Sequence, residues 1–208
     1  ETAGHPKMLM AEDGRVALAS ASTVRRRLLE SAGLKFDVLT SNVDEDVVRA
    51  TLVDVDPVDV AEVLARAKAD DVARRINADV VIGADQVLAL GEDVLTKPAD
   101  MAEARAQLLA LKGRRHQLHS AVVIAQDSEI TWVHVETVDV TMRDYSPAFV
   151  GRYLAAAGAD ALASVGCYQL EGPGVQLIDT FSGDYFSVLG LPLMPLLAEL
   201  RRLQVLDS

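Results

Sequence analysis

The chain has 208 residues, of which 50% are hydrophobic and 25% are charged, so it carries enough apolar side chains to bury the core of one domain. This composition excludes a disordered or low-complexity chain, and no apolar run reaches the roughly 18 residues that a membrane-spanning helix needs. The formal net charge of −11 argues against a broad nucleic-acid-binding surface, but it allows one small anionic ligand in a local basic pocket.

We expect a single domain over residues 1–208, in which residues 1–14 form a flexible or non-native start. Glu1–Met8 lacks the basic stretch followed by an apolar stretch that marks an export signal. The one cysteine, Cys167, excludes an internal disulfide bond and fits a reducing compartment. These features predict a cytoplasmic location.

The first half of the chain predicts strands and helices in turn. A short buried strand over 15–19 leads into a Ser-rich turn and a helix over 24–32, which Ser22 or Thr23 caps and Gly33 ends. The next expected elements are a strand over 36–39, an acidic segment over 43–46, a strongly periodic helix over 58–76 and a compact strand over 79–85.

The second half predicts an Ala/Leu-rich helix and then a long hairpin. The expected elements are a helix over 99–111, strands over 116–125 and 130–142 around a turn at 126–129, a helix from Ser146 to Gly158, a Gly-punctuated stretch over 166–190 and a last helix from Pro192 to about Leu203. Helices and strands mix without strict β-α-β alternation, so we predict an α/β fold with a mixed sheet and two lobes.

Three consecutive arginines, Arg25, Arg26 and Arg27, open the first predicted helix, where cations oppose the helix dipole. A strand, a Ser-rich turn and a helix N-terminus that carries arginine make a good anion site, because free N–H groups and guanidinium groups converge there. The alternative is that these arginines face solvent and pair with acids such as Glu30.

Two lysines lie in informative places. Lys68 falls in the middle of the apolar face of the long helix, so it either extends to the edge of that face or lines a cleft and meets an anion. Lys97 precedes Pro98, which holds the backbone extended. A lysine fixed in this way suits a phosphate, and an ordinary loop lysine is the alternative.

Acidic side chains predict a place for water or a cation. Asp85 ends the apolar run 80–84, and in open α/β sheets the carboxyl ends of strands face the ligand crevice. A carboxylate there suits metal binding or water activation, whereas capping of a turn is the alternative. The run Asp44-Glu45-Asp46 either holds a hard divalent cation through oxygen ligands or forms a solvated loop.

Other polar positions have simpler interpretations. His116 and His119 are three residues apart on a predicted strand, so they face opposite sides and do not make a zinc pair. We expect Trp132 and His134 to pack against the sheet. We expect Cys167 to be a small buried side chain rather than a nucleophile.

Together these residues describe one pocket with cations for phosphates, acids for a cation and Asp85 for water. The motifs in chain order are Leu18-Ala19-Ser20-Ala21-Ser22-Thr23-Val24-Arg25-Arg26, Val43-Asp44-Glu45, the Lys68 helix, Gly83-Ala84-Asp85-Gln86-Val87 with Lys97-Pro98, Leu111-Lys112-Gly113-Arg114 with His116, Gly166-Cys167-Tyr168-Gln169-Leu170-Glu171-Gly172, Gly183-Asp184-Tyr185, and Val188-Leu189-Gly190-Leu191-Pro192-Leu193. Over about Val16 to Leu200 these motifs resemble the Maf family of nucleotide pyrophosphatases, also called septum formation inhibitor proteins.

The resemblance implies hydrolysis of a nucleoside triphosphate between its α and β phosphates, with a divalent metal cation, Mg²⁺ or Mn²⁺. It also implies an elongated mixed sheet flanked by helices, similar to the inosine triphosphatase-like (Ham1-like) group, with a cleft between two lobes. A homodimer is expected for this family, and neither a nucleic-acid polymer nor a membrane is an expected partner.

The resemblance also implies roles for residues. Asp85 matches the proposed proton acceptor and, with Glu45, the cation site, while Lys68 and Lys97 act with it in catalysis by binding phosphate. Phosphate binding is further expected from Ser20, Ser22, Arg25 and, more weakly, Arg26. Attack on a triphosphate builds charge on its oxygens, so positioning and electrostatics suffice for such chemistry.

Three positions separate the branches of the family, and here they carry Val24, Gln86 and Glu171. The 7-methyl-GTP branch has Trp, Gln and Glu at them and the dTTP/UTP branch has Arg, Thr and Gln, so two of three match the former. A carboxylate accepts from both the N1–H and the 2-amino group of guanine, whereas thymine offers one ring N–H. Val24 departs from the pattern, since it cannot stack on a cationic base as an aromatic would.

Three rival interpretations stay open. The chain could prefer dTTP or UTP. It could be a nucleotide-binding regulator of septum formation with little turnover, although a pure binder needs no acid that orients water. A phosphatase with a covalent Ser or Cys intermediate would need a companion base, and no recognisable motif supplies one.

Overall fold

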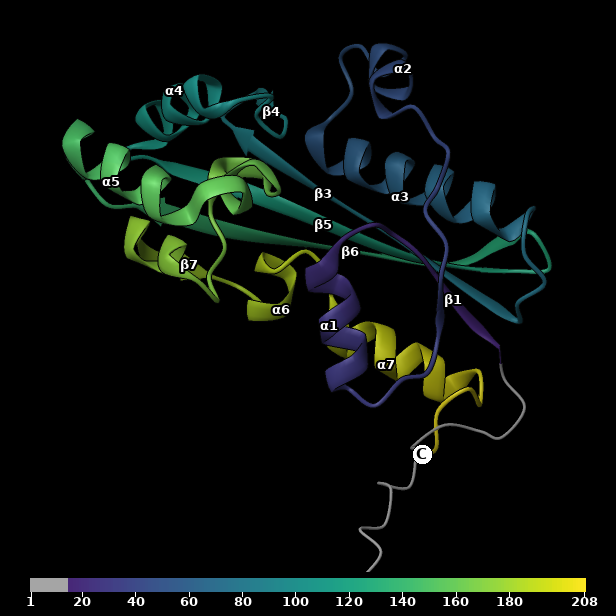
Figure 1. The fold of residues 1–208 in the computed structure, drawn as a ribbon. Helices are drawn as coiled ribbons and strands as arrows, with labels where there is room; N and C mark the ends of the chain where they lie inside the picture. The colour runs from purple at the N-terminus through teal and green to yellow at the C-terminus, as the bar shows by residue number, and fades with distance from the viewer. Residues whose placement is uncertain (1–14) are drawn as a thin grey trace, which may run out of the picture.

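A computed structural model describes residues 15–208, which form one seven-stranded mixed sheet with helices on both faces (Figure 1). The strands are β1 (Val16–Ala19), β2 (Asp37–Val38), β3 (Val80–Leu90), β4 (Asp93–Leu95), β5 (Arg115–Gln126), β6 (Glu129–Met142) and β7 (Ile178–Ser182). Their order is β2-β1-β3-β5-β6-β7, with β4 paired to β3. β1 runs parallel to β2 and β3, and the other pairs are antiparallel, as the predicted mixed sheet requires.

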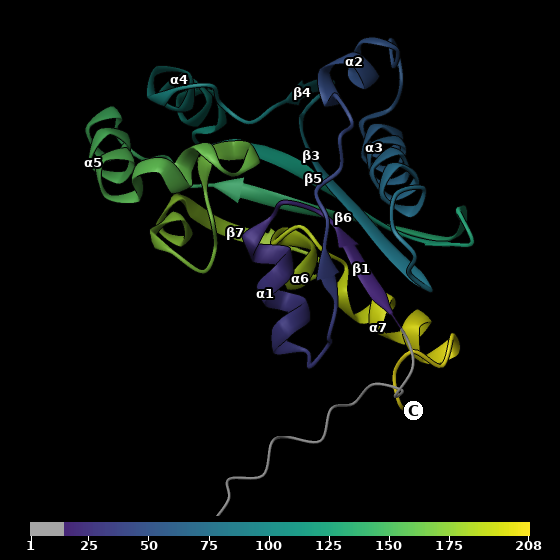
Figure 2. The same ribbon diagram turned by 45° about the vertical axis from the view of Figure 1, so that its right-hand side comes forward.

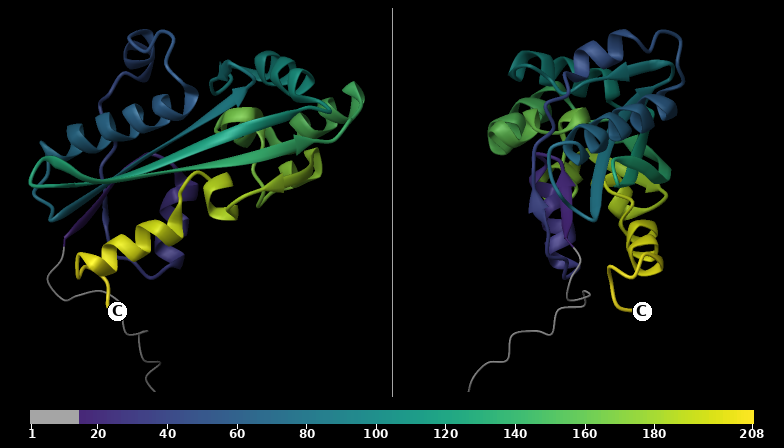
Figure 3. Two further views of the ribbon diagram at one scale, coloured as in Figure 1. Left: turned by 180° about the vertical axis from the view of Figure 1, so that it is seen from behind. Right: turned by 90° about the vertical axis from the view of Figure 1, so that its right-hand side faces the viewer.

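Helices lie on both sides of the sheet (Figures 2 and 3). They are α1 (Thr23–Ser31), α2 (Glu45–Ala50), α3 (Pro57–Ala73), α4 (Met101–Leu111), α5 (Pro147–Ala157), α6 (Tyr185–Val188) and α7 (Leu193–Arg202), with 3-10 turns η1 (Gly158–Leu162), η2 (Val165–Cys167) and η3 (Pro173–Leu177). None of the described helices is long and apolar enough to cross a membrane.

Strand alternation divides the core. Odd-numbered residues of the central strands, such as Val81 and Val123, pack against α3. Even-numbered residues face the opposite layer, where Ile82 contacts the cluster of α1 and α7, and Leu88 contacts that of α4 and α5. The two clusters on this face give the molecule its two lobes.

The close approach of α3 to β3 depends on Gly83. A Cβ atom at this position would lie 2.5 Å from the Ala65 carbonyl oxygen and 2.7 Å from the Ala69 Cβ. Because both neighbours belong to the rigid body of α3, only glycine fits without moving the helix. This packing brings Lys68 of α3 next to Asp85 of β3.

The central strand β3 has a gap on one edge. β5 pairs with it from Val81 to Ala89, while the opposite edge is shared by β1, which pairs as far as Gly83, and β4, which starts at Leu88. Residues 84–87 of that edge therefore have no strand partner within the described chain. The gap lies directly beyond the carboxyl end of β1, between the two lobes.

Several predicted elements are confirmed, and some differ. Ser22 caps α1 and the β5–β6 turn falls at Asp127 and Ser128 as expected. The helix expected over 58–76 is α3, which begins at Pro57 and ends at Ala73. The strand predicted to end at Asp85 continues to Leu90, because the buried run Val87–Leu90 pairs with both β4 and β5.

The acidic segment is also not a plain loop. Asp44 accepts hydrogen bonds from the backbone N–H groups of Asp46 and Val47 and thereby starts α2. The expectation for residues 1–14 lies outside the described residues.

Candidate active site

A buried ion-pair cluster lies at the gap in β3. The Lys68 ammonium donates to Asp85 Oδ1 at 2.7 Å and also lies 2.8 Å from Glu45 Oε1. The three groups come from α3, β3 and the start of α2, so the cluster forms only in the folded chain. Lys68 does not extend to the edge of its helix face, since its side chain is 13% exposed and pairs with these two carboxylates.

Asp85 is the most buried member, with its side chain 6% exposed. Burial raises the pKa of its carboxyl above the usual value, against the opposing attraction of Lys68 and Arg25. Its second oxygen, Oδ2, is buried and has no hydrogen-bond partner. A buried carboxylate oxygen without a partner is costly, so a water, a cation or a substrate group is needed there.

Arg25 closes the cluster from the side of α1. Its Nε donates to the Gly190 carbonyl oxygen at 2.7 Å, and its Nη1 donates to the Ser20 hydroxyl at 3.2 Å. Burial lowers the pKa of Arg25, while the charges of Asp85 and Glu45 oppose this shift. Ser22 caps the helix by accepting from the Arg25 N–H, so the Ser-rich turn fixes the arginine in place.

Lys97 is an exposed residue that follows β4 and lies within electrostatic reach of the same cluster. Desolvation is the largest cause that lowers the pKa of its ammonium, and the nearby charges of Arg25 and Lys68 add to it. Glu45 and Asp85 act in the opposite sense. Three cations thus converge on two carboxylates, which is an arrangement suited to a polyanion.

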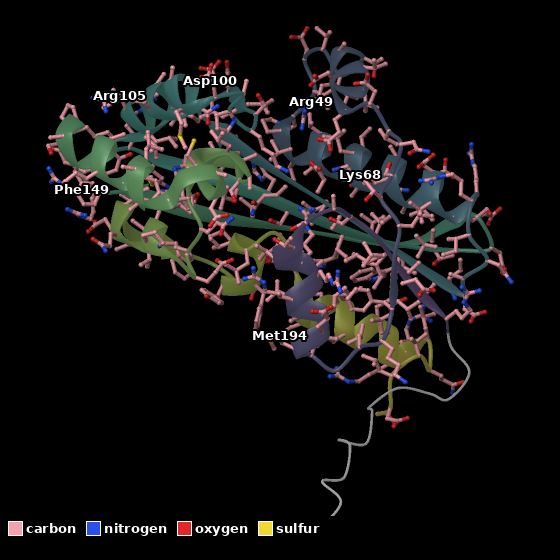
Figure 4. The ribbon with its side chains drawn as sticks, in the orientation of Figure 1. Arg49, Lys68, Asp100, Arg105, Phe149 and Met194 are labelled. Atoms are coloured by element: carbon pink, nitrogen blue, oxygen red, sulfur yellow. The ribbon has the colours of Figure 1, made fainter. Side chains whose placement is uncertain are left out.

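Glu45 is held between two cations, Lys68 and Arg49, since Arg49 Nη2 contacts its Oε2 at 2.9 Å. Figure 4 labels these two cations, Arg49 on α2 and Lys68 on α3. Burial would raise the pKa of Glu45, but the hydrogen bond and charge of Lys68 outweigh it, so the pKa is lowered overall. Arg49 was not among the residues predicted from the sequence to belong to the site. The signal for it was the i, i+4 spacing from Glu45, which becomes visible once Asp44 is read as a helix cap.

Within the cluster, Asp85 and Glu45 are the two carboxylates available to a metal ion. Across residues 15–208 no group of three or more His, Cys, Asp or Glu side chains could hold a metal ion. Mg²⁺ is commonly held by one or two carboxylates together with phosphates, so Asp85 and Glu45 fit a cation shared with a phosphorylated ligand.

Arg26 is not brought to the cluster. Its Nε lies 2.7 Å from Glu30 Oε1, and both side chains are exposed. This is the solvent-facing alternative considered for the arginine run. The side chain of Asp46 is similarly exposed, at 94%, and its carboxylate pairs with Arg49.

The three branch-separating positions meet on the other side of the gap. Val24, Gln86 and Glu171 line one small cavity together with Tyr168 and Val188. Alternation along β3 explains the arrangement, because consecutive residues Asp85 and Gln86 point to opposite faces of the sheet. One face therefore carries the charged cluster and the other the cavity.

A buried pair supports the wall of this cavity. The Tyr168 hydroxyl lies 2.7 Å from His116 Nε2, and His116 Nδ1 is buried without a partner. Burial lowers the pKa of His116 to about 4, so the ring is neutral at pH 7. His119 contacts Thr137 on the opposite face, as the spacing predicted, and Cys167 is fully buried.

The family model described as Maf-like protein matches residues 15–203. A 7-methyl-GTP pyrophosphatase of Mesorhizobium japonicum is 51% identical over 93% of this chain and 98% of its own length. A nucleoside triphosphate pyrophosphatase of Granulibacter bethesdensis is 45% identical over 92% of this chain and 98% of its own length. Among solved structures, the Ham1 protein of Staphylococcus aureus has a TM-score of 0.41 at 18% identity, covering 62% of this chain and 72% of that one.

Proposed function

Since the chain belongs to the Maf-like protein family, we propose that it hydrolyses a nucleoside triphosphate between the α and β phosphates, giving a nucleoside monophosphate and pyrophosphate. The observation that carries this proposal is the convergence of Arg25, Lys68 and Lys97 on a buried carboxylate with one unpartnered oxygen. Phosphate oxygens supply the negative charge that this cluster lacks.

The proposed chemistry uses the two oxygens of Asp85 differently. Lys68 holds Oδ1, which fixes the plane of the carboxylate. Oδ2 then accepts a proton from the attacking water as the bond between the α and β phosphates breaks and pyrophosphate leaves. A raised pKa makes Asp85 a better base near neutral pH than an ordinary aspartate.

Arg25 and Lys97 bind the phosphate chain in this proposal. Arg25 is already oriented by Gly190 and Ser20, so little side-chain freedom is lost when phosphate binds. Glu45 and Asp85 would hold a divalent cation, Mg²⁺ or Mn²⁺, which when bound neutralises phosphate charge.

The base preference that we propose is for a guanine-type nucleotide such as 7-methyl-GTP. Supporting it are the relatives bearing that activity in their names and the presence of Gln86 and Glu171 in one cavity. Val24 offers apolar contact to the base in place of stacking.

The experiment separates catalysis from binding. Wild type and Asp85→Asn are compared by ³¹P NMR of the products and by calorimetric binding of a non-hydrolysable α,β-methylene nucleotide. We expect monophosphate and pyrophosphate from wild type, and from Asp85→Asn a loss of at least about 100-fold in rate with binding retained. A nucleoside diphosphate and orthophosphate as products, or full activity of Asp85→Asn, would refute the proposal.

A further inference from the structure

The short segment that carries Lys97, between β4 and α4, is held by two side chains of α4. On one side of Lys97, Gln107 Nε2 donates to the Thr96 carbonyl oxygen at 2.8 Å. On the other side, Glu103 Oε2 accepts from the Ala99 backbone N–H at 2.9 Å. Glu103 and Gln107 are four residues apart, so they lie one above the other on the same face of α4. Both flanks of Lys97 are therefore tied to one helix.

Of these two contacts, the Gln107 hydrogen bond acts most directly on Lys97. The Thr96 carbonyl belongs to the peptide group that joins Thr96 to Lys97, and this group is planar, so holding its oxygen also fixes the Lys97 nitrogen. Pro98, which is buried, keeps the Lys97 backbone extended from the other side. An exposed lysine within reach of Asp85 thus has a fixed backbone.

Gln107 is itself anchored in the core of the lobe formed by α4 and α5. Its amide nitrogen must face Thr96, because a carbonyl oxygen only accepts, so its Oε1 faces the other way. There the fully buried Cys167 thiol donates to Oε1, with Sγ 3.5 Å away. Burial raises the pKa of this thiol to about 12, so it keeps its hydrogen at neutral pH. The Cys167 backbone is held in turn, since its carbonyl oxygen accepts from the Tyr153 hydroxyl of α5 at 2.5 Å.

The fold does not depend strongly on the contact between Gln107 and Thr96. Thr96 is exposed, so water can hydrogen-bond to its carbonyl oxygen when the amide is removed. Methionine at position 107 would keep the length and the apolar packing of the side chain. Loss of this hydrogen bond should therefore loosen the segment around Lys97 without unfolding the lobe.

We propose that Gln107 is a positioning residue, which holds Lys97 for phosphate binding through the Thr96 carbonyl group. Arg25 and Lys68 approach the phosphate chain from α1 and α3, whereas Lys97 is presented by the lobe of α4 and α5. A lysine on a loose segment would lose more conformational freedom on binding than a lysine on a fixed one, and its affinity for phosphate would fall accordingly. This inference rests on the proposed function, in which Lys97 binds phosphate.

The test is a double-mutant cycle between Gln107→Met and Lys97→Met, measured by calorimetric binding of inorganic tripolyphosphate with Mg²⁺. Lys97→Met alone should weaken binding about tenfold or more. In the wild-type background Gln107→Met should weaken binding about three- to tenfold, the size of one hydrogen bond. In the Lys97→Met background the same change should weaken binding less than about twofold, because Gln107 acts through Lys97.

The matched control is Gln117→Met, which removes an exposed glutamine of β5 and should keep the affinity within about twofold in both backgrounds. A role of Gln107 in the fold alone would lower the affinity equally in both backgrounds, and this result would overturn the inference. Unchanged affinity in Gln107→Met, or no binding of tripolyphosphate by wild type, would overturn it as well. If Gln107→Met does not fold, Gln107→Asn replaces it in the cycle, since its amide stops one methylene short of Thr96.

Because tripolyphosphate carries no base or ribose and the cycle measures binding, the coupling is independent of nucleotide turnover. Failure of the proposed function would appear as missing pyrophosphate release from nucleotides with the coupling between Gln107 and Lys97 intact. Failure of this inference would appear as pyrophosphate release without that coupling.

Discussion

Replacing Lys68 with methionine should destabilise the protein in a pH-dependent way. The change removes the ammonium that pairs with Asp85 and Glu45, whose side chains are 6% and 37% exposed. Glu45 keeps Arg49, but Asp85 loses its ion-pair and hydrogen-bond partner and keeps only the more distant charges of Arg25 and Lys97. Breaking a buried pair in this way costs about 3–5 kcal/mol.

The sign of the pH dependence follows from the direction of the Asp85 shift. Its folded pKa already lies above the unfolded value, and loss of Lys68 raises it further. Such a group binds a proton on folding between the two pKa values, so stability is present at low pH and lost as pH rises through the folded pKa. The cost of Lys68→Met should therefore shrink as pH falls from 8 to 5, by up to about 1.4 kcal/mol per pH unit.

Urea denaturation at pH 5, 6, 7 and 8 measures this effect for wild type and variant. The matched control is Arg66→Met on the same helix, whose partner Glu62 lies 2.8 Å away at the surface. The control should cost at most about 1 kcal/mol at every pH. Equal losses for the two variants, or a loss for Lys68→Met that does not change with pH, would refute the reasoning.

Three further predictions test other parts of the site. Gly83→Ala should lower the free energy of unfolding by about 1–3 kcal/mol in denaturant titrations, because its Cβ overlaps α3. The control Gly151→Ala on α5, where the atom nearest to the added Cβ lies 3.6 Å away, should be neutral or stabilising. Equal effects of the two changes would contradict the packing argument. Arg25→Ala should reduce kcat/KM for pyrophosphate release at least about 100-fold, while the kcat/KM of Arg26→Ala should stay within about twofold of wild type. A large effect of Arg26→Ala would show that this arginine leaves Glu30 to bind substrate. The His116 ring should show no titration in NMR spectra between pH 8 and 5, because its pKa is lowered to about 4, and a midpoint near 6.5 would mean that the ring is solvated.

The sequence predicted the elements whose signals are local. Ser22 before the arginine run, Ser146-Pro147 and the alternating strands over 116–142 follow from caps and periodicity, and each forms as expected. The placement of Lys68 on an apolar face left open whether the lysine extends to the edge of that face or meets an anion. Its partners lie 17 and 23 positions away in sequence, on other elements, so only the fold identifies them as Asp85 and Glu45.

The failures have a common physical cause. The strand over 79–85 is predicted too short, because Asp85 interrupts its apolar run. Lys68 pairs with this acid, and the strand continues to Leu90. The short strands β4 and β7 have weak local signals and form by pairing with β3 and β6. The hydrogen bonds of Gln86 could not be predicted either, since two of its three acceptors are main-chain carbonyl groups about 100 residues away.

The most direct test of the account is pyrophosphate release with Mg²⁺ from 7-methyl-GTP, GTP, dTTP, UTP and CTP at matched concentrations. The account predicts release of pyrophosphate with the highest kcat/KM for 7-methyl-GTP. A higher kcat/KM for dTTP or UTP would contradict the proposed preference for a guanine-type base. The absence of pyrophosphate release from all five nucleotides would contradict the proposed activity itself.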